Sequence, residues 1–285
     1  MRQRAFKQVD VFTATPYRGN PLAVVLDASG LSEDAMQHFA RWTNLSETAF
    51  LSAPQDEAAD YRVRIFTPGG ELPFAGHPTL GSCHAWLEAG GKPRNREFVT
   101  QECKAGLVRI RRESSRLAFA APPLTRSAPS AAMLPQVAAA LGLKANHVVA
   151  AQTLDNGPVW ISLLLDHPQT VLKLSPDHLA LKNLGVKVGV ASIYEGVPRS
   201  ADNAPLLEVR AFAAASGIPE DPVTGSLNAS LAQWLIGEGH LPTRYLAAQG
   251  ACLQRAGRVH VEQDQRGQVW VGGESVTCIS GSVSL

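Results

Sequence analysis

One short phrase occurs twice in this chain of 285 residues, and the repeat limits the possible folds more than any other feature. The first copy is His77-Pro78-Thr79-Leu80-Gly81-Ser82, and the second is Asp221-Pro222-Val223-Thr224-Gly225-Ser226. The copies lie 144 residues apart (221 − 77), which is about half the chain. Each opens a run of small and apolar residues, so we expect two buried helices, over residues 78–89 and 225–236.

The residues before each phrase repeat as well. Val63-Arg64-Ile65-Phe66 precedes the first copy, and Val209-Arg210-Ala211-Phe212 precedes the second. A weaker echo relates Gly19-Asn20-Pro21-Leu22 to Asn156-Gly157-Pro158-Val159. Three echoes in the same order predict a duplicated domain of roughly 140 residues.

The pattern along the chain is many short strands around one buried helix in each half, which indicates an α+β architecture without a parallel βαβ series. The Pro- and Ala-rich stretch that begins at Ala121-Pro122-Pro123 is the best linker candidate. We therefore expect domains at residues 1–123 and 124–285, with the alternative that the last strand packs back on the first domain. Ser32 and Ser175 are expected to cap helices.

Composition narrows the function classes. A net charge of +1 gives no electrostatic footprint for nucleic acid. The sequence contains no apolar run of the ~20 residues that span a bilayer, and its start lacks a signal-peptide core. We expect a cytoplasmic protein that binds neither membrane nor nucleic acid. The four cysteines form no C-x-x-C pair and no G-x-G-x-x-G phrase is present, so neither a metal nor a nucleotide cofactor is predicted.

The two helix starts are candidate anion sites. The first turn of a helix leaves backbone N–H groups unpaired, and the helix dipole adds partial positive charge. The amides of residues 76–79 and 223–226, facing one cleft, would hold a small molecule that carries a carboxylate. The alternative is plain capping, for which Ser, Thr and Asp are common.

Glu47 is the candidate proton carrier. It lies between a helix end and an apolar strand, with Leu45, Ala49 and Phe50 as neighbours. Partial burial there would raise the pKa of its carboxyl group and allow proton transfer near neutral pH. The alternative is a solvated turn. Together with His77, Asp221 and Ser226, Glu47 could form an acid/base cleft that uses no metal or cofactor.

Three phrases resemble those of the PhzF-like isomerase family of phenazine biosynthesis. They are Asn44-Leu45-Ser46-Glu47-Thr48, the segment from Gly70 to Gly81, and Glu220-Asp221-Pro222-Val223-Thr224-Gly225-Ser226. The resemblance covers essentially the whole chain. It implies a fold like that of diaminopimelate epimerase, with two pseudo-symmetric domains, each a curled mixed β-sheet around a central helix, and the site between them.

The resemblance also implies an activity and roles for residues. The family's founding reaction isomerises trans-2,3-dihydro-3-hydroxyanthranilate by moving a proton from C3 to C1, without a cofactor, and its members are commonly homodimers. Carried over by motif, Glu47 is the proton carrier, and His77, Asp221 and Ser226 bind and orient the substrate. Gly76 and Gly225 allow close approach of the backbone.

Some features depart from the family pattern and leave the reaction open. Tyr17-Arg18 stands where relatives often carry Pro-Phe, and the counterpart of Cys83 in the second half is Leu227, so a two-thiol racemase lacks its second base. Three hypotheses remain: an isomerase of a small cyclic carboxylic acid, an amino or hydroxy acid racemase that uses Glu47 with a base such as Asp221, and a small-carboxylate binding protein without turnover.

Overall fold

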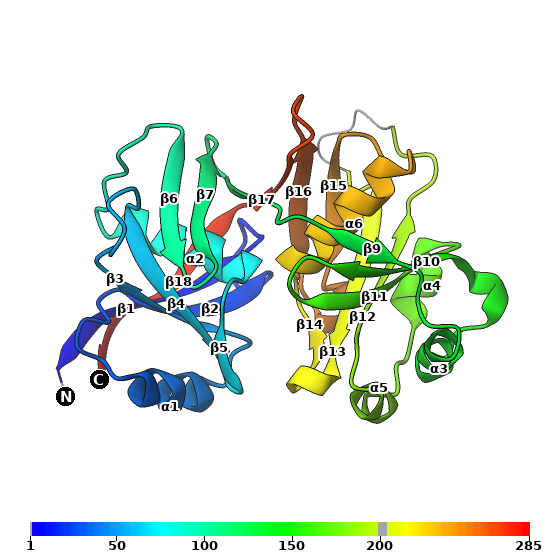
Figure 1. The fold of residues 1–285 in the computed structure, drawn as a ribbon, viewed down its shortest axis with the longest axis horizontal. Coiled ribbons are helices and arrows are strands. Elements are labelled where there is room, and N and C mark those ends of the chain that lie inside the picture. The colour runs from blue at the N-terminus through cyan, green and yellow to red at the C-terminus, as the bar shows by residue number, and fades with distance from the viewer. Residues whose placement is uncertain (1, 199–203) are drawn as a thin grey trace. The chain divides into compact units, whose positions relative to one another are not determined.

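The computed structural model describes residues 2–198 and 204–285, and the chain divides into two compact units (Figure 1). Unit 1 comprises Met1–Ala120 and Gly272–Leu285, and unit 2 comprises Ala121–Val271. The expected domains, 1–123 and 124–285, differ from these units mainly at the end of the chain. Residues 272–285 belong to unit 1 because the last strand pairs along the whole of the first one.

Unit 1 is a mixed sheet with two helices. Its elements are β1 (Gln3–Val11), β2 (Asn20–Val25), α1 (Glu33–Thr43), β3 (Thr48–Ser52), β4 (Tyr61–Thr67), β5 (Gly70–Leu72), α2 (Gly76–Glu88), β6 (Phe98–Cys103), β7 (Gly106–Arg112), β8 (Leu117–Ala120) and β18 (Ser275–Ser284). The pairs β2–β3 and β4–β6 are parallel. The pairs β18–β1, β1–β2, β3–β4, β4–β5, β6–β7 and β7–β8 are antiparallel.

Unit 2 repeats this plan with additional helices. Its elements are β9 (Thr125–Ser127), α3 (Met133–Ala140), η1 (Ala145–His147), β10 (Val148–Asp155), β11 (Val159–Leu165), α4 (Pro168–Lys173), α5 (His178–Leu184), β12 (Lys187–Ile193), β13 (Leu207–Ala213), η2 (Ala214–Ser216), β14 (Ile218–Asp221), α6 (Gly225–Gly237), β15 (Arg244–Gln249), η3 (Ala251–Leu253) and β16 (Gly257–Gln263). The strand β17 (Val269–Gly273) leads the chain back to unit 1.

Seven strand pairs of unit 2 correspond to seven of the eight pairs given above for unit 1, all except β7–β8. The pairs β11–β12 and β13–β15 are parallel, like β2–β3 and β4–β6. The antiparallel pairs β9–β10, β10–β11, β12–β13, β13–β14 and β15–β16 match β18–β1, β1–β2, β3–β4, β4–β5 and β6–β7. The predicted α+β class and the duplication are confirmed.

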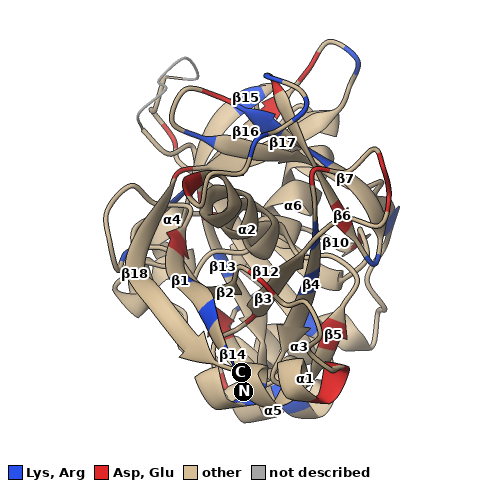
Figure 2. Ribbon diagram, turned by 90° about the vertical axis from the view of Figure 1, so that its left-hand side faces the viewer, with Lys and Arg blue, Asp and Glu red and all other residues tan. Residues whose placement is uncertain are grey.

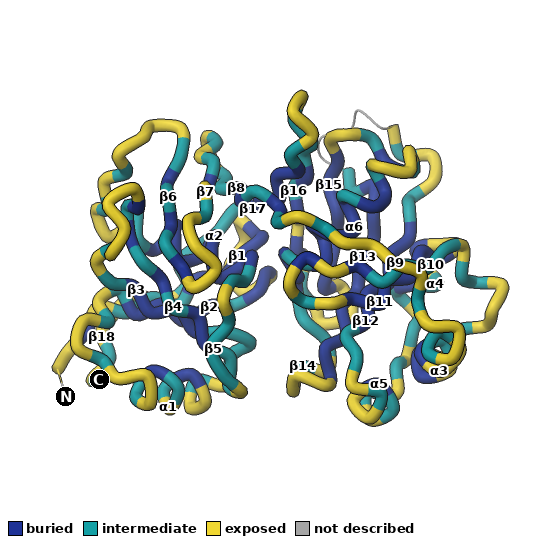
Figure 3. The backbone as a smooth tube through the Cα atoms, viewed as in Figure 1, coloured by how far each residue is buried: buried dark blue, intermediate teal, exposed yellow. Residues whose placement is uncertain are grey.

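Each unit has one central helix. In unit 1, α2 contacts β1, β2, β3, β6, β8 and β18, and in unit 2, α6 contacts β10 and β16. Most residues of both helices are buried (Figure 3). The helices begin and end within two residues of the predicted bounds, 78–89 and 225–236. A helix that is enclosed by a curled sheet needs apolar residues on every side, which explains why both runs lack a polar stripe.

The duplication extends to a matched pair of ionic contacts. Arg64 in β4 makes two hydrogen bonds to Glu71 in β5, of 2.7 and 2.9 Å, and Arg210 in β13 makes two to Glu220 in β14, of 2.9 and 2.8 Å. The acidic residue on β5 and the basic residues on β4 are visible in Figure 2. Because β5 and β14 lead into the central helices, these pairs fix the strands from which both helix starts emerge.

The two predicted helix caps have different outcomes. Ser32 caps α1, since its side chain accepts a hydrogen bond from the Ala35 backbone N–H. Ser175 was expected to cap the next predicted helix, and this is wrong: the cap is Asp177, which accepts from the Ala180 N–H. Both residue types are good caps, and the acid two residues later is the one from which the helix begins. None of the helices in the described residues has the length and apolar character needed to span a membrane.

Candidate active site

Glu47 lies in the short turn between α1 and β3. Asn44 ends α1 in the left-handed conformation, with φ of 54°, and Thr48 begins β3. The Thr43 hydroxyl donates to the Ala40 carbonyl at 3.0 Å and lies 3.0 Å from the Thr48 hydroxyl, so the two threonines tie the helix end to the strand. The side chain of Glu47 is 13% exposed. The solvated turn is therefore wrong, because the carboxylate is largely withdrawn from water.

His77, in the first turn of α2, is the neighbour of Glu47. Its Nε2 lies 3.5 Å from Glu47 Oε2, which is longer than an ordinary hydrogen bond. The residue is 4% exposed, and burial lowers the pKa of the ring to about 3. A nearby carboxylate ordinarily favours the charged ring, but here burial dominates. The imidazole is therefore neutral at physiological pH.

Asn20, at the start of β2, fixes the other side of the imidazole. Asn20 Nδ2 lies 3.4 Å from His77 Nδ1. With the amide as donor, Nδ1 accepts, and the ring proton sits on Nε2, the nitrogen that faces Glu47. The preceding residue, Gly19, donates its N–H to the buried carboxylate of Asp10 at 2.9 Å. A Cβ on Gly19 would lie 2.1 Å from the Val11 carbonyl oxygen, so only glycine fits this turn.

Asp221 lies at the corresponding place in unit 2, at the end of β14. Its Oδ2 accepts a hydrogen bond of 2.6 Å from the Thr224 hydroxyl. The Thr224 backbone N–H donates to Gln249 Oε1 at 3.0 Å. Asp221 and the helix start that follows it are therefore joined by side chains as well as by the backbone.

Ser226, in the first turn of α6, is held from β11 and the turn before it. Its hydroxyl accepts from Trp160 Nε1 at 3.3 Å, and its backbone carbonyl accepts from Asn156 Nδ2 at 2.9 Å. Asn20 and Asn156 thus reach the two central helix starts from corresponding turns. The weak echo between their segments was the sequence signal for both residues.

The set of free helix amides is smaller than the sequence suggested. The Thr79 N–H donates to the Ala75 carbonyl and the Thr224 N–H donates to Gln249, so two of the expected donors are used internally. Neither Ala75 nor Thr224, the residues at the N-cap positions, makes a side-chain capping bond. Pro78 has no N–H, and the amides of Gly76, His77, Gly225 and Ser226 remain among the candidates to bind an anion.

The structure groups the predicted residues into two sets. Glu47, Gly76 and His77 lie together in unit 1, and Asp221, Gly225 and Ser226 lie together in unit 2. The first set can transfer a proton, because it pairs a desolvated carboxylate with a neutral imidazole. The second set offers hydrogen-bond donors and a fixed carboxylate. Sequence reasoning assigned no role to Asn20, Asn156, Trp160 or Gln249; the last two carry no local motif.

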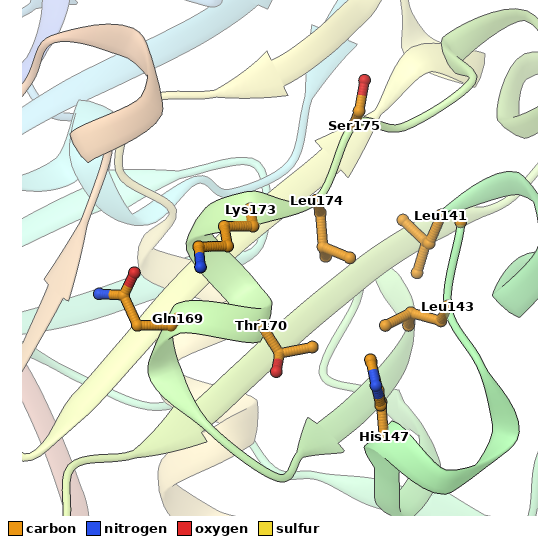
Figure 4. Close-up of a pocket in the computed structure, with 9 residues that line it drawn as sticks. Leu141, Leu143, His147, Gln169, Thr170, Lys173, Leu174 and Ser175 are labelled. Carbon is orange, nitrogen blue, oxygen red and sulfur yellow. The ribbon is translucent and has the colours of Figure 1, made fainter.

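A hollow of ≈ 360 Å³ lies elsewhere in unit 2 and is lined by the segment that follows α3 and by residues of η1 and α4, including Leu141, His147 and Lys173 (Figure 4). It contains none of the predicted site residues. Over residues 2–198 and 204–285, no group of three or more His, Cys, Asp and Glu side chains is placed to hold a metal ion.

Comparisons with known proteins agree along the whole chain. Residues 9–281 match the PhzC-PhzF family, described as phenazine biosynthesis-like proteins. Antisense-enhancing sequence 1 of Schizosaccharomyces pombe is 36% identical over 299 residues, with 99% of each chain covered. The trans-2,3-dihydro-3-hydroxyanthranilate isomerase of Pseudomonas aeruginosa is 32% identical over 289 residues, with 97% of this chain and 98% of that protein covered.

The fold agrees as well. The crystal structure of a phenazine biosynthesis protein of the PhzF family from Bacillus anthracis matches with a TM-score of 0.85 at 23% identity, over 100% of both chains. The fold match covers both units, and the sequence relatives exceed 30% identity over nearly their full lengths. The chain therefore belongs to the PhzF family of phenazine biosynthesis-like proteins, and it is an isomerase.

Proposed function

We propose that this isomerase moves a proton between two carbons of a small cyclic carboxylic acid and that Glu47 carries the proton. The observation that supports this most directly is the Glu47–His77 contact: a carboxylate 13% exposed lies 3.5 Å from a neutral imidazole that is 4% exposed. A shielded carboxylate can take a proton from one carbon and return it to another, because little water is present to exchange it.

The proposed substrate class follows the relative from Pseudomonas aeruginosa, which is named for trans-2,3-dihydro-3-hydroxyanthranilate. That compound carries a carboxylate and a ring C–H that can be ionised. We propose that Gly76, His77, Asp221, Gly225 and Ser226 bind and orient it. The uncapped amides at the two helix starts suit a carboxylate, and His77 Nε2–H is a neutral donor.

Glu47→Gln tests the role of the carboxylate. The variant keeps the shape and the hydrogen-bonding reach of the side chain but cannot hold and release the proton. We expect kcat for trans-2,3-dihydro-3-hydroxyanthranilate to fall by roughly 10² to 10⁴, while the substrate Kd stays within about threefold. Asp221→Asn and His77→Ala should weaken binding as well as rate, since both residues are assigned to orientation.

The measurement is incorporation of solvent deuterium into substrate and product, run beside a binding titration. Exchange by Glu47→Gln at the wild-type rate would assign the proton transfer to another group. Inversion at a single carbon would identify a racemase in place of the isomerase. Binding by the wild-type protein without any exchange would identify a binding protein. The expected homodimer and cytoplasmic location rest on the family resemblance and the composition, and sedimentation equilibrium measures the former.

A further inference from the structure

The turn before α6 is held by a buried glutamine to which the proposed function gives no role. Gln249 is the last residue of β15 and is 2% exposed. Its Oε1 accepts from the Thr224 backbone N–H at 3.0 Å and from Asn228 Nδ2 at 2.9 Å. Its Nε2 donates to the Asp221 backbone carbonyl at 3.1 Å and to Thr224 Oγ1 at 2.9 Å. These four bonds use the full capacity of a carboxamide.

The orientation of this carboxamide is fixed by its backbone partners. A backbone N–H can only donate and a backbone carbonyl can only accept, so Oε1 must face Thr224 and Nε2 must face Asp221. The Thr224 hydroxyl accepts from Nε2, and its own hydrogen is therefore directed at Asp221 Oδ2, 2.6 Å away. Gln249 thus orients the Thr224 hydroxyl so that its hydrogen points at the Asp221 carboxylate.

The hydrogen bonds that run from Gln249 through Thr224 to Asp221 form a relay, and the residues around it restrict its geometry. Asn228 Nδ2 also donates to the Thr224 carbonyl at 2.9 Å. The next residue in the chain, Gly250, has φ of 98°, and a Cβ there would lie 2.7 Å from the Pro222 carbonyl oxygen. With water largely excluded, loss of the Gln249 side chain would leave buried polar groups of the turn unmatched, which is costly.

Unit 1 has a buried glutamine in a similar place that does something else. Gln101 in β6 donates to the Thr79 hydroxyl at 3.1 Å and accepts from the Tyr61 hydroxyl at 2.8 Å. Neither bond reaches the residue that corresponds to Asp221, namely His77. The relay from Gln249 through Thr224 is therefore particular to the half that carries Asp221.

We infer that Gln249 is a positioning residue, which acts through Thr224 to hold the Asp221 carboxylate in the orientation that binds substrate. This inference rests on the substrate-binding role that the proposed function gives to Asp221. Because the proton is carried by Glu47, loss of the relay changes KM more than kcat.

The experiment compares isosteric substitutions. Gln249→Met removes all four bonds, Thr224→Val removes only the hydroxyl, and Thr224→Ser retains it. Gln233→Met is the matched control, because Gln233 in α6 donates to the Pro122 and Ala229 carbonyls, at 3.1 and 3.3 Å, away from Asp221. Kinetics are measured with trans-2,3-dihydro-3-hydroxyanthranilate, and backbone amide exchange is followed at Thr224 in each folded variant.

Gln249→Met and Thr224→Val should each raise KM about tenfold, with kcat within about threefold of wild type. The KM of the double variant should be no higher than that of the single variant with the higher KM, since both changes break the same relay. Thr224→Ser and Gln233→Met should stay within about twofold. Wild-type KM in folded Gln249→Met, or additive effects in the double variant, would overturn the inference.

The experiment still tests the inference if Gln249→Met does not fold or if the proposed function fails. If Gln249→Met does not fold, the comparison of Thr224→Val with Thr224→Ser decides, and equal KM values for these two overturn the relay. If the wild-type protein does not turn over the substrate, the proposed function fails, and amide exchange decides the inference. The Thr224 amide should then exchange at least about tenfold faster in Gln249→Met than in Gln233→Met; equal rates overturn it.

Discussion

Burial of the His77 ring affects the stability of the folded protein at low pH. Burial lowers the pKa of its imidazole from the ordinary 6.5 to about 3. Between these values the unfolded chain binds a proton that the folded protein does not. The stability contributed by the neutral ring is therefore complete above pH 6.5 and is lost as the pH falls towards 3.

We predict that the His77 ring is still neutral at pH 5, with its proton on Nε2. Nitrogen-15 NMR of the side chain reports both the charge and the tautomer, and His77→Asn identifies the resonance. The same variant should show a shallower loss of unfolding free energy between pH 6.5 and 4. A titration midpoint near 6.5 for this ring, or a proton on Nδ1, would contradict the arrangement with Asn20.

Single residues show what the sequence could predict about the site. Glu47 and His77 were singled out from their segments, with a solvated turn and a helix cap as the alternatives, and the family resemblance then assigned their roles. Their contact depends on packing between residues thirty positions apart (77 − 47), which no local pattern encodes. Gln249 was missed for the same reason: it reaches Asp221 from a strand that follows α6, and a glutamine in a strand has no motif.

At the scale of elements, the two Arg–Glu pairs are matched in geometry but differ in burial. The side chains of Arg210 and Glu220 are 5% and 7% exposed, whereas those of Arg64 and Glu71 are 25% and 11% exposed. Arg64 also bonds Glu33 at 2.7 Å, while the remaining bonds of Arg210 go to the carbonyls of Val171 and Leu174. Arg64 therefore keeps an acidic partner when its strand neighbour is removed.

We predict that Glu220→Gln lowers the free energy of unfolding by about 3 kcal/mol, because it removes the carboxylate that is hydrogen-bonded to a buried guanidinium. Glu71→Gln should cost about 1 kcal/mol, since the pair is more exposed and Glu33 remains. Urea unfolding of both variants provides the comparison, each serving as the control for the other. Equal losses would show that burial does not distinguish the two pairs.

Elements were predicted best where one environment surrounds the whole segment. The two central helices were found to within two residues, because a buried helix in a curled sheet is apolar on all sides. The cap of α5 was assigned to Ser175 instead of Asp177, since two good capping residues stand two positions apart and only the geometry of the backbone selects one. The return of the last strand to unit 1 was predicted only as an alternative, because its pairing partner β1 lies at the other end of the sequence.

At the scale of the whole molecule, unit 2 is formed by one continuous segment, whereas unit 1 is formed by two segments from opposite ends of the sequence. The strand pairs of unit 2 from β9 to β16 lie within residues 121–271, whereas β1 needs β18, with which it pairs from Gln3 to Val11. A chain that ends at Val271 should therefore keep unit 2 folded and lose much of unit 1. Residues 121–271 alone should fold.

Tryptophan fluorescence distinguishes these states, because Trp42 and Trp86 lie in unit 1 and Trp160, Trp234 and Trp270 in unit 2. Urea unfolding of the shortened chain, with Trp42 and Trp86 replaced by Phe, should retain a cooperative transition from unit 2. Addition of a peptide of residues 272–285 to the shortened chain that retains Trp42 and Trp86 should restore the transition of unit 1. A shortened chain in which both units unfold as in the full chain would show that β18 is dispensable.

The pairing of β18 with β1 also sets an order of events on the ribosome. Domains are generally completed from the N-terminus onward as the chain emerges, but here β1 is made first and its partner only after every strand of unit 2. The nascent N-terminal sheet therefore has an unpaired edge at β1 until the second unit has been synthesised. An open β edge is a template for pairing with other chains. Slow translation of residues 121–271 would lengthen that exposure, so aggregation during synthesis depends on codons that lie outside the unit at risk.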